Sequence, residues 1–304
     1  ECNFAVGSRE LGRFRVSAYV QRNTSGMVIR RIESRIPTFE ELHLPSVIAE
    51  LSMAQRGLVI LVGATGSGKS TTLAAMVGHR NRNFDGHIIC IEDPVEFTHT
   101  HERCIVTQRE VGIDTVSYLV GLKNALRQAP DTMLIGEVRQ METMDHAMHF
   151  AETGHLCFTT LHANDTTQAL ERILNFFPRE QRQVYLADLA TNLRAIIGQQ
   201  LVPTADGNGR RVAVEVLLNT GLVADLIRKG EFHKIRDVIR RSTELGMQTF
   251  DQSIFDLYRV GVIGEEEALR HATSENEVRL MIKLHNTEDP NRMGDGMENV
   301  TLVE

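Results

Sequence analysis

Hydrophobic and polar positions alternate over the first 32 residues of the chain. In the stretch RFRVSAYV, Phe14 and Val16 point to one side of a predicted strand. Arg13 and Arg15 point to the other side. Alternation of this kind is typical of a strand with one buried face. We therefore expect residues 1–36 to be the C-terminal part of a β-rich domain whose beginning precedes this sequence.

The pattern of hydrophobic and polar residues changes after residue 36. Pro37 and Pro45 bracket a polar stretch, and each proline disfavours helix at the residue before it, so we interpret residues 37–45 as a linker. From residue 46 onward, apolar runs of strand length alternate with stretches of helical period. The expected strands are 58–62, 87–92, 103–108, 132–136 and 155–161, and the expected helices are 46–56, 70–79, 115–128 and 141–152.

This alternation predicts an α/β fold with a mostly parallel sheet and helices on both of its faces. Beyond residue 178 the pattern is helical, except for a hairpin-like stretch at 201–218 that turns at Gly207 to Gly209. We assign 46–285 to the α/β domain, with helices in its C-terminal part. Residues 286–304 are acidic and poor in large apolar side chains, which predicts a disordered tail.

Composition narrows the classes of function. The 304 residues suit two domains, and a hydrophobic fraction of 42% is ordinary for a globular protein. The net charge of −7 gives no overall attraction to nucleic acid or anionic lipid. The four cysteines lack the paired spacing of a structural zinc site, and the apolar runs are far shorter than the ~20 residues that span a bilayer. We therefore expect a cytoplasmic protein without membrane insertion.

The stretch GATGSGKS at 63–70 fits the phosphate-binding pattern G-x-x-x-x-G-K-[ST] between a predicted strand and a predicted helix. In such a loop the backbone N–H groups turn around phosphates, Lys69 reaches the β- and γ-phosphates, and the Ser70 hydroxyl binds Mg²⁺. The pattern predicts ATP and Mg²⁺ as ligands. The residues expected at the nucleotide are Gly63, Ala64, Thr65, Gly66, Ser67, Gly68, Lys69, Ser70 and Thr71.

Acidic residues end two of the later predicted strands. IEDPVE carries Glu92, Asp93 and Glu96, whereas LIGEVR carries Glu137 behind Gly136 at the place where an aspartate is expected. A hydrolysing site needs one carboxylate for magnesium or its water and one for the attacking water. We expect Glu137 and Glu92 to be catalytic. Metal ligation is expected from Ser70, Asp93 and Glu137.

Two histidines flank the predicted strand of HLCFTTLHAND. A lone histidine beside a strand is usually a structural hydrogen-bonding group, but this strand can lie next to the phosphate loop. His162 would then stand at the strand's carboxyl end, within reach of a γ-phosphate. It would report the nucleotide state to the helix that Asn164 or Asp165 caps. We expect His162 to be catalytic and His155 to contribute to cofactor binding.

Together these motifs resemble the secretion and pilus motor ATPases, a RecA-like family in which the second acidic motif ends in Gly-Glu. LRQAPDTMLIGEVR resembles the family signature, IEDPVE its aspartate box and TGHLCFTTLH its histidine box. GRFRVSAYVQRN is similar to the type IV pilus retraction ATPases, PilT and PilU. FTTLHAND followed by QALERILNFFP, and the acidic tail, are closer to PilU. The resemblance implies a RecA-like domain preceded by a PAS-like one.

The resemblance also implies a ring of six subunits in which each N-terminal domain packs on a neighbour's nucleotide domain. An arginine supplied by a neighbour would stabilise the charge of phosphoryl transfer, and the candidates are Arg13, Arg15 and Arg30. The alternative for these arginines is a solvated strand face. Expected partners are further copies of the chain, a related retraction ATPase and a pilus platform protein of the inner membrane.

The function expected from this resemblance is an ATP-driven motor for pilus retraction at the cytoplasmic side of the inner membrane. LVADLIRK at 222–229 stands where PilT carries a motif tied to retraction, so a role as accessory to a related motor is an alternative. A second alternative is a translocase of nucleic acid. The acidic balance, the 5% aromatic content and the lack of tryptophan argue against it.

Overall fold

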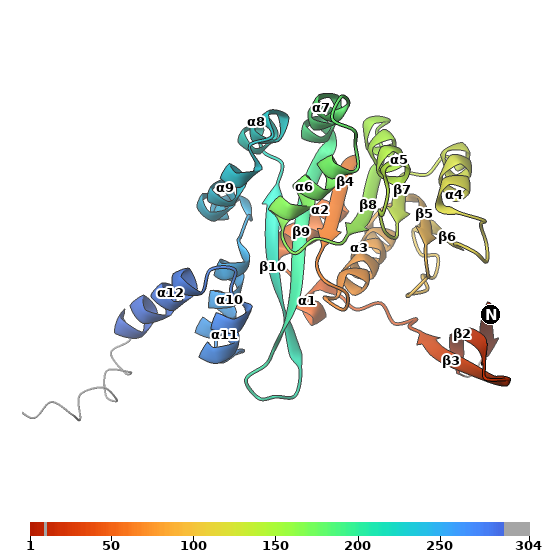
Figure 1. Cartoon of the computed structure of the whole chain (residues 1–304), viewed down its shortest axis with the longest axis horizontal. Helices are drawn as coiled ribbons and strands as arrows, with labels where there is room; N and C mark the ends of the chain where they lie inside the picture. Colours follow the sequence, from red (N-terminus) through yellow and green to blue (C-terminus); the bar gives the residue numbers. More distant parts are fainter. Residues whose placement is uncertain (9–10, 289–304) are drawn as a thin grey trace, which may run out of the picture.

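A seven-stranded sheet forms the centre of the computed structural model, which describes residues 1–8 and 11–288 (Figure 1). Its strand order is β10-β9-β4-β8-β7-β5-β6, and all neighbours are parallel except β9 and β10. The strands are β4 (Gly57–Val62), β5 (Gly86–Glu92), β6 (Cys104–Glu110), β7 (Thr132–Ile135), β8 (Leu156–Leu161), β9 (Leu193–Pro203) and β10 (Arg210–Leu218).

The central strands are apolar along their whole length because helices cover both faces of the sheet. In β4, Leu58 and Ile60 enter one core while Val59 and Leu61 enter the other. Parallel sheets buried on two sides require this composition. The predicted α/β class, with a mostly parallel sheet between helical layers, is confirmed.

The helices form two layers on the sheet. The first core contains buried side chains of α4 (Tyr118–Ala125), α5 (Met141–Glu152), α6 (Thr166–Asn175), α7 (Arg182–Asn192), α8 (Gly221–Lys229) and α9 (Ile235–Arg241). The second contains those of α1 (Phe39–Leu42), α2 (Ser46–Ser52) and α3 (Lys69–Asn83). The α3 helix therefore starts on one face of the sheet at the carboxyl end of β4.

A small antiparallel sheet precedes these layers and stands apart from them in Figure 1. It consists of β1 (Cys2–Ser8), β2 (Gly12–Gln21) and β3 (Thr24–Ile32). Arg15 pairs directly with Arg30, and Arg13 lies two residues away on β2, so the three arginines share one face. Beyond β3, Glu33 forms a parallel bridge with Phe97, which ties this sheet to the loop after β5.

The C-terminal helices α10 (Phe250–Arg259), α11 (Glu265–His271) and α12 (Glu275–Glu288) build a core of their own. It includes Phe250, Ile254 and Val278 and rests on the β9–β10 hairpin through Val202 and Ala213. The predicted tail begins at 286, but its first three residues continue α12, and 289–304 lie outside the described residues. The domain limits at 36, 45 and 285 stay predictions.

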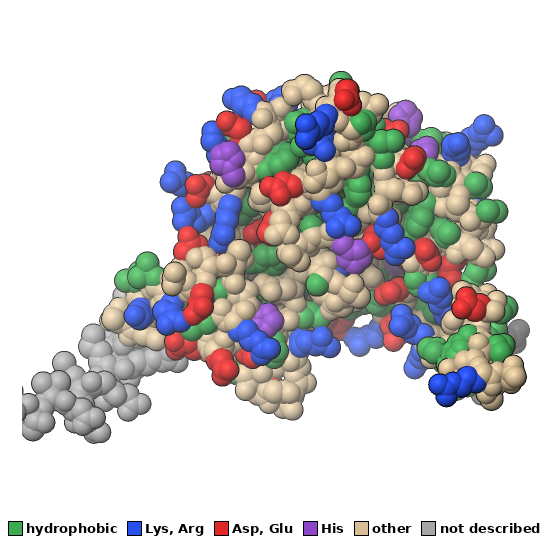
Figure 2. Space-filling model, viewed as in Figure 1, with side chains coloured by type: hydrophobic (Ala, Val, Ile, Leu, Met, Phe, Trp, Pro, Cys, Tyr) green, Lys and Arg blue, Asp and Glu red, His purple; other side chains and the backbone are tan. Residues whose placement is uncertain are grey.

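Among the described residues, no helix combines the length and the apolar character that a membrane crossing requires. Figure 2 shows basic and acidic side chains gathered where the N-terminal sheet meets the main body. This junction borders the candidate site.

Candidate nucleotide-binding site

The phosphate-binding loop joins β4 to α3, as its sequence predicted. Gly66 and Gly68 have φ angles of +80° and +93°, which favour glycine. A Cβ atom on Gly63 would collide with the carbonyl oxygen of Gln199 on the neighbouring strand β9. The glycines therefore let the loop close over the start of α3, whose N-terminal N–H groups and dipole attract an anion.

Lys69 is anchored inside the loop. Its Nζ atom donates to the carbonyl oxygens of Gly63 at 2.7 Å and Ala64 at 2.9 Å. Burial lowers the pKa of Lys69, and the carboxylates of Glu137 and Glu96 oppose this shift. The ammonium group is thus held at the loop, where a phosphate would replace two carbonyl contacts with a stronger charged one.

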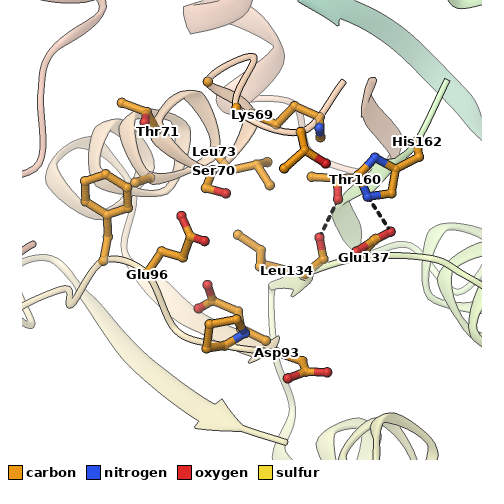
Figure 3. A pocket seen from close by; sticks show the side chains of 18 of the residues that line it. Lys69, Ser70, Thr71, Leu73, Asp93, Glu96, Leu134, Glu137, Thr160 and His162 are labelled. Carbon is orange, nitrogen blue, oxygen red and sulfur yellow. Dashed lines mark hydrogen bonds and ion pairs between the residues drawn. The ribbon is translucent and has the colours of Figure 1, made fainter. Parts of the chain in front are cut away.

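A cavity of about 610 Å³ opens in front of the loop (Figure 3). Most of its lining comes from four regions of the chain that lie far apart in sequence, because the carboxyl ends of β4, β5, β7 and β8 meet at one edge of the sheet. Its polar and charged lining is Arg30, Thr65, Lys69, Ser70, Thr71, Glu92, Asp93, Glu96, His99, Glu137, Arg139, Thr160 and His162.

Glu137 has a partner on each of its carboxylate oxygens. His162 Nε2 lies 3.0 Å from Oε1, and Arg139 Nη2 lies 2.8 Å from Oε2. The turn that carries Glu137 is fastened to β8, because Thr160 Oγ1 donates to the Gly136 carbonyl at 2.6 Å. The Val138 amide donates in turn to the Thr160 carbonyl at 2.9 Å. The second threonine of FTTLH thus fixes the acid that faces the loop.

Gly136, directly before the acid, lies in a crowded place. A Cβ atom at this position would lie 3.0 Å from Tyr118 Oη and 3.1 Å from the Glu92 Cα atom. The Gly136 amide also donates to the Ile91 carbonyl at 2.8 Å, which holds β7 close to the end of β5. Any side chain at this position would press on the end of β5, so glycine lets the turn before Glu137 pack closely.

The three acids of IEDPVE occupy different environments. Glu92 accepts a hydrogen bond from Gln108 Nε2 at 3.2 Å, and burial raises its pKa to about 7. Figure 3 shows the Glu96 carboxylate turned toward Ser70, while the Asp93 side chain lies at the far side of the cavity. Glu96 is exposed and free to meet a ligand from this position.

The chain matches known proteins along nearly its whole length. Residues 3–300 match the family described as type II/IV secretion system protein. The chain is 61% identical over 302 residues to the type IV pilus ATPase PilU of Pseudomonas aeruginosa, covering 99% of this chain and 79% of that protein. The chain belongs to the secretion and pilus motor ATPases.

Further relatives of this ATPase family agree with the fold. The type IV pilus retraction ATPase PilT of the same organism is 40% identical over 272 residues, covering 90% of this chain and 79% of that protein. A crystal structure of the retraction motor PilT with bound ADP superimposes with a TM-score of 0.86 at 38% identity, covering 92% of this chain and 79% of that chain. The predicted resemblance is therefore confirmed, including its closer match to PilU.

The residues at and behind the phosphate loop fit the nucleotide that this ATPase family uses. Behind the loop, the buried Ser67 hydroxyl and the Gln199 Oε1 atom have no hydrogen-bond partner within residues 1–8 and 11–288. In that same part of the chain, no three His, Cys, Asp or Glu side chains are arranged to hold a metal alone. Magnesium in nucleotide enzymes needs only one or two protein oxygens besides phosphates and water, and Ser70 with Glu96 or Glu137 would be able to supply them.

The three candidate arginines of this ATPase chain lie differently with respect to the cavity. Arg30 lines the cavity of its own chain, while its expected action on a neighbour stays a prediction. The bridge from Glu33 to Phe97 brings it there. Arg13 and Arg15 are not among the described residues that line this cavity, and their action on a neighbour stays a prediction.

His155 lies away from the cavity in this chain. This residue precedes β8, whereas His162 follows it, and the six strand residues between them separate the two ends by about 20 Å. His155 Nδ1 contacts Thr153 Oγ1 at 3.0 Å and the Phe150 carbonyl at 3.2 Å. These contacts close the turn between α5 and β8, and the expected contribution of His155 to cofactor binding stays a prediction.

Two residues of the site were absent from the predicted set. Glu96 belongs to IEDPVE, but the sequence does not show which way each acid points around the turn at Pro94. Arg139 directly follows LIGEV and holds the Glu137 carboxylate. Its position two residues after a catalytic acid was the available signal.

Proposed function

We propose that this chain is a Mg²⁺-dependent ATPase that works as a ring of six subunits and powers retraction of type IV pili in twitching motility. It acts in the cytoplasm, at an inner-membrane platform protein and beside a related retraction ATPase. The observation that carries this proposal is the convergence on one cavity of the phosphate loop, Glu96, Glu137, His162 and Arg30. Side chains suited to phosphate binding, activation of the attacking water, nucleotide sensing and stabilisation of the developing charge thus all line the same cavity.

The geometry divides the chemistry among these side chains. The loop N–H groups and Lys69 hold the phosphates and stabilise the charge that develops on the γ-phosphoryl oxygens. Bound Mg²⁺ would neutralise the β- and γ-phosphate oxygens, with Ser70 as its protein ligand. Glu96 faces this place from the opposite wall, so we assign to it the orientation and deprotonation of the attacking water.

Glu137 and His162 form the sensing half of the site. In the structure they pair with each other, so a γ-phosphate that attracts the imidazole would separate them. Glu137 would then be free to hold a water of the magnesium shell. Loss of the γ-phosphate after hydrolysis restores the pair, which links the chemical state to the position of the β8 end.

The role beside a related motor rests on α8. This helix buries Val223, Leu226 and Ile227 on its inner face and exposes Leu222 at its start. Its sequence, LVADLIRK, stands where the resemblance to PilT implies a motif tied to retraction. We therefore assign to this chain a contribution to retraction that depends on a related ATPase.

Steady-state ATP hydrolysis of the full chain tests the proposal. We expect turnover that requires Mg²⁺, disappears in Lys69→Ala and increases when a related retraction ATPase is added. Double- and single-stranded DNA at low salt should leave the rate unchanged. Turnover that depends on DNA would instead establish a nucleic-acid translocase, and the absence of turnover with every partner would overturn the enzymatic assignment.

A further inference from the structure

A buried carboxylate outside the nucleotide cavity joins the starts of two helices. Glu215 on β10 is 5% exposed. It accepts hydrogen bonds from the Thr166 amide at 2.9 Å and the Thr166 hydroxyl at 2.7 Å. The backbone amide of Phe250 also faces this carboxylate, where it opposes the rise in pKa that burial causes. Thr166 is the first residue of α6 and Phe250 is the first residue of α10, so one side chain is bonded to one helix start and lies beside the other.

One of these helices leads directly back to the nucleotide cavity. Only residues 163–165 separate His162, which contacts Glu137, from Thr166. Asp165 caps α6 by accepting from the Gln168 amide at 2.7 Å. A displacement of His162 must be absorbed within this short segment or passed to the first turn of α6, where Glu215 holds Thr166.

The other helix opens the C-terminal unit, defined here as α10–α12. Phe250 belongs to the separate core of this unit. Ser253 Oγ accepts the Val214 amide at 3.0 Å, so α10 is attached to the same strand that carries Glu215. This polar contact adds to the apolar packing of the unit on Val202 and Ala213 of the β9–β10 hairpin.

Close packing makes this junction stiff. Gly198 on β9 pairs with Glu215 on one side and with Val62, the last residue of β4, on the other. A Cβ atom on Gly198 would lie 2.9 Å from the Phe250 ring and 3.4 Å from the Glu215 Cβ atom. Only strand β9 therefore separates Glu215 from the end of β4, where the phosphate loop begins. The close packing around Gly198 leaves little space for local relaxation.

We propose that Glu215 is a positioning residue that couples the His162 segment to the C-terminal unit α10–α12. Its carboxylate transmits the nucleotide-dependent movement of the α6 start to α10 and, conversely, holds His162 in register with Glu137. The inference rests on the proposed nucleotide-driven function and adds to it a route by which the C-terminal helices respond to ATP. Burial raises the pKa of Glu215, while the Thr166 hydrogen bonds oppose this shift.

Two variants weaken this junction in different ways. Glu215→Gln keeps an acceptor oxygen but turns an amide N–H₂ group toward the other N–H donor, so one of the two helices loses its contact. Thr166→Val removes only the hydroxyl donor and keeps the side-chain shape. If Glu215→Gln does not fold, Thr166→Val still tests the junction.

Asp251→Asn provides the matched control. Asp251 is also a buried carboxylate of α10, and it accepts the Thr273 amide at 2.7 Å and the Arg236 guanidinium at 2.6 Å. Its partners belong to α9 and to the α11–α12 connection, not to α6. It therefore reports the general cost of weakening a buried carboxylate in the same unit.

Hydrogen exchange of the full chain, with and without a non-hydrolysable ATP analogue and Mg²⁺, measures the coupling. We expect nucleotide to slow exchange at 163–170 and at 250–259 in the natural chain and in Asp251→Asn. In Glu215→Gln and Thr166→Val the response at 163–170 should remain, while that at 250–259 falls at least threefold. In the same two variants kcat should fall about threefold to tenfold with KM unchanged.

Three results would overturn the inference. These are an unaltered response at 250–259 in both variants, an equal loss in Asp251→Asn, and a natural chain that binds nucleotide without any response at 250–259. A natural chain that binds nucleotide and shows the response, but never hydrolyses ATP, contradicts the proposed function and leaves the coupling supported.

Discussion

His162 Nε2 and Glu137 Oε1 lie 3.0 Å apart, and Arg139 occupies the second oxygen of the same carboxylate. Glu137 is therefore fully engaged by protein groups before any ligand arrives. For this acid to act on magnesium or water, at least one of these two contacts must open. The activity of the site consequently depends on which carboxylate is free, and Glu96 is the freer of the two.

Glu96→Gln and Glu137→Gln should therefore fail in different ways. The amide keeps the shape of each side chain and removes its charge, so both variants should still bind ATP. Glu96→Gln should lower kcat by about 10²–10⁴-fold, the usual contribution of a general base. Glu137→Gln should also slow turnover and, in addition, weaken the dependence of nucleotide affinity on Mg²⁺. Nucleotide binding and single-turnover hydrolysis measure the two effects, and full activity of Glu96→Gln would return the role of base to Glu137 or Glu92.

Lys69→Ala should remove the fixed cation of the phosphate loop. We expect at least a hundredfold loss of turnover, about the cost of one preorganised donor at a developing charge, together with a clear loss of ATP affinity. The exposed Lys123 on α4 offers a control of equal charge, because it is far from the loop in sequence and absent from the described lining of the cavity. Natural turnover in Lys69→Ala would refute the assignment of the loop.

Gly136→Ala should destabilise the chain, because its methyl group meets Tyr118 Oη at 3.0 Å and the Glu92 Cα atom at 3.1 Å. Overpacking of this kind costs about 1–3 kcal/mol in the free energy of unfolding. Gly221→Ala at the start of α8 meets nothing within 4 Å and should be neutral or slightly stabilising. Urea unfolding compares the two variants, and equal stability would show that β7 and β5 can separate.

Glu92 should make stability depend on pH. Burial raises its pKa from an ordinary value of 4.5 to about 7, so the folded state holds a proton that the unfolded state releases. This contribution to stability is complete below pH 4.5 and is lost as the pH rises through 7. Glu92→Gln should remove this contribution to the pH dependence of the unfolding free energy. The variant should therefore gain stability relative to the natural chain from pH 5 to pH 8. Denaturant unfolding across this pH range, with the exposed Glu180→Gln as control, shows whether stability rises or falls with pH.

Arg30→Ala should reduce turnover by about a thousandfold, the lower range for an arginine that stabilises phosphoryl transfer. Because Arg30 lines the cavity of its own chain, mixing this variant with Lys69→Ala should not restore activity. The same mixture with Arg13→Ala/Arg15→Ala tests the expected action on a neighbour, for which recovery is predicted. Size measurements must confirm mixed rings, and rescue of Arg30→Ala would place this arginine in a neighbour's site.

The sequence predicted the local elements well because their apolar periods are strong. The strand predicted at 58–62 is β4, and the helix predicted at 115–128 appears as α4 followed by a short 3₁₀ turn. The position of His162 depended on whether β8 lies beside β4, and the pairing confirms that it does. Strand order arises from non-local contacts that no local pattern contains.

Orientation was the part that could not be predicted. His155 and His162 stand symmetrically around one apolar run, and only the parallel direction of β8 decides which end meets the phosphate loop. Glu92, Asp93 and Glu96 are all carboxylic acids, and the sequence alone does not tell which of them faces the phosphates. The turn after β5 and its bridge to Glu33 give each of them a different environment.

The bridge between Glu33 and Phe97 connects the N-terminal sheet directly to the segment of the cavity that carries Glu96. Two backbone hydrogen bonds hold it, from the Glu33 amide to the Glu96 carbonyl at 3.3 Å and from the Thr98 amide to the Glu33 carbonyl at 3.1 Å. A pull on the small sheet is therefore borne at the residue assigned to activate water. Tension applied to that sheet would change the distance from Glu96 to the phosphates, so external load would set the pace of hydrolysis.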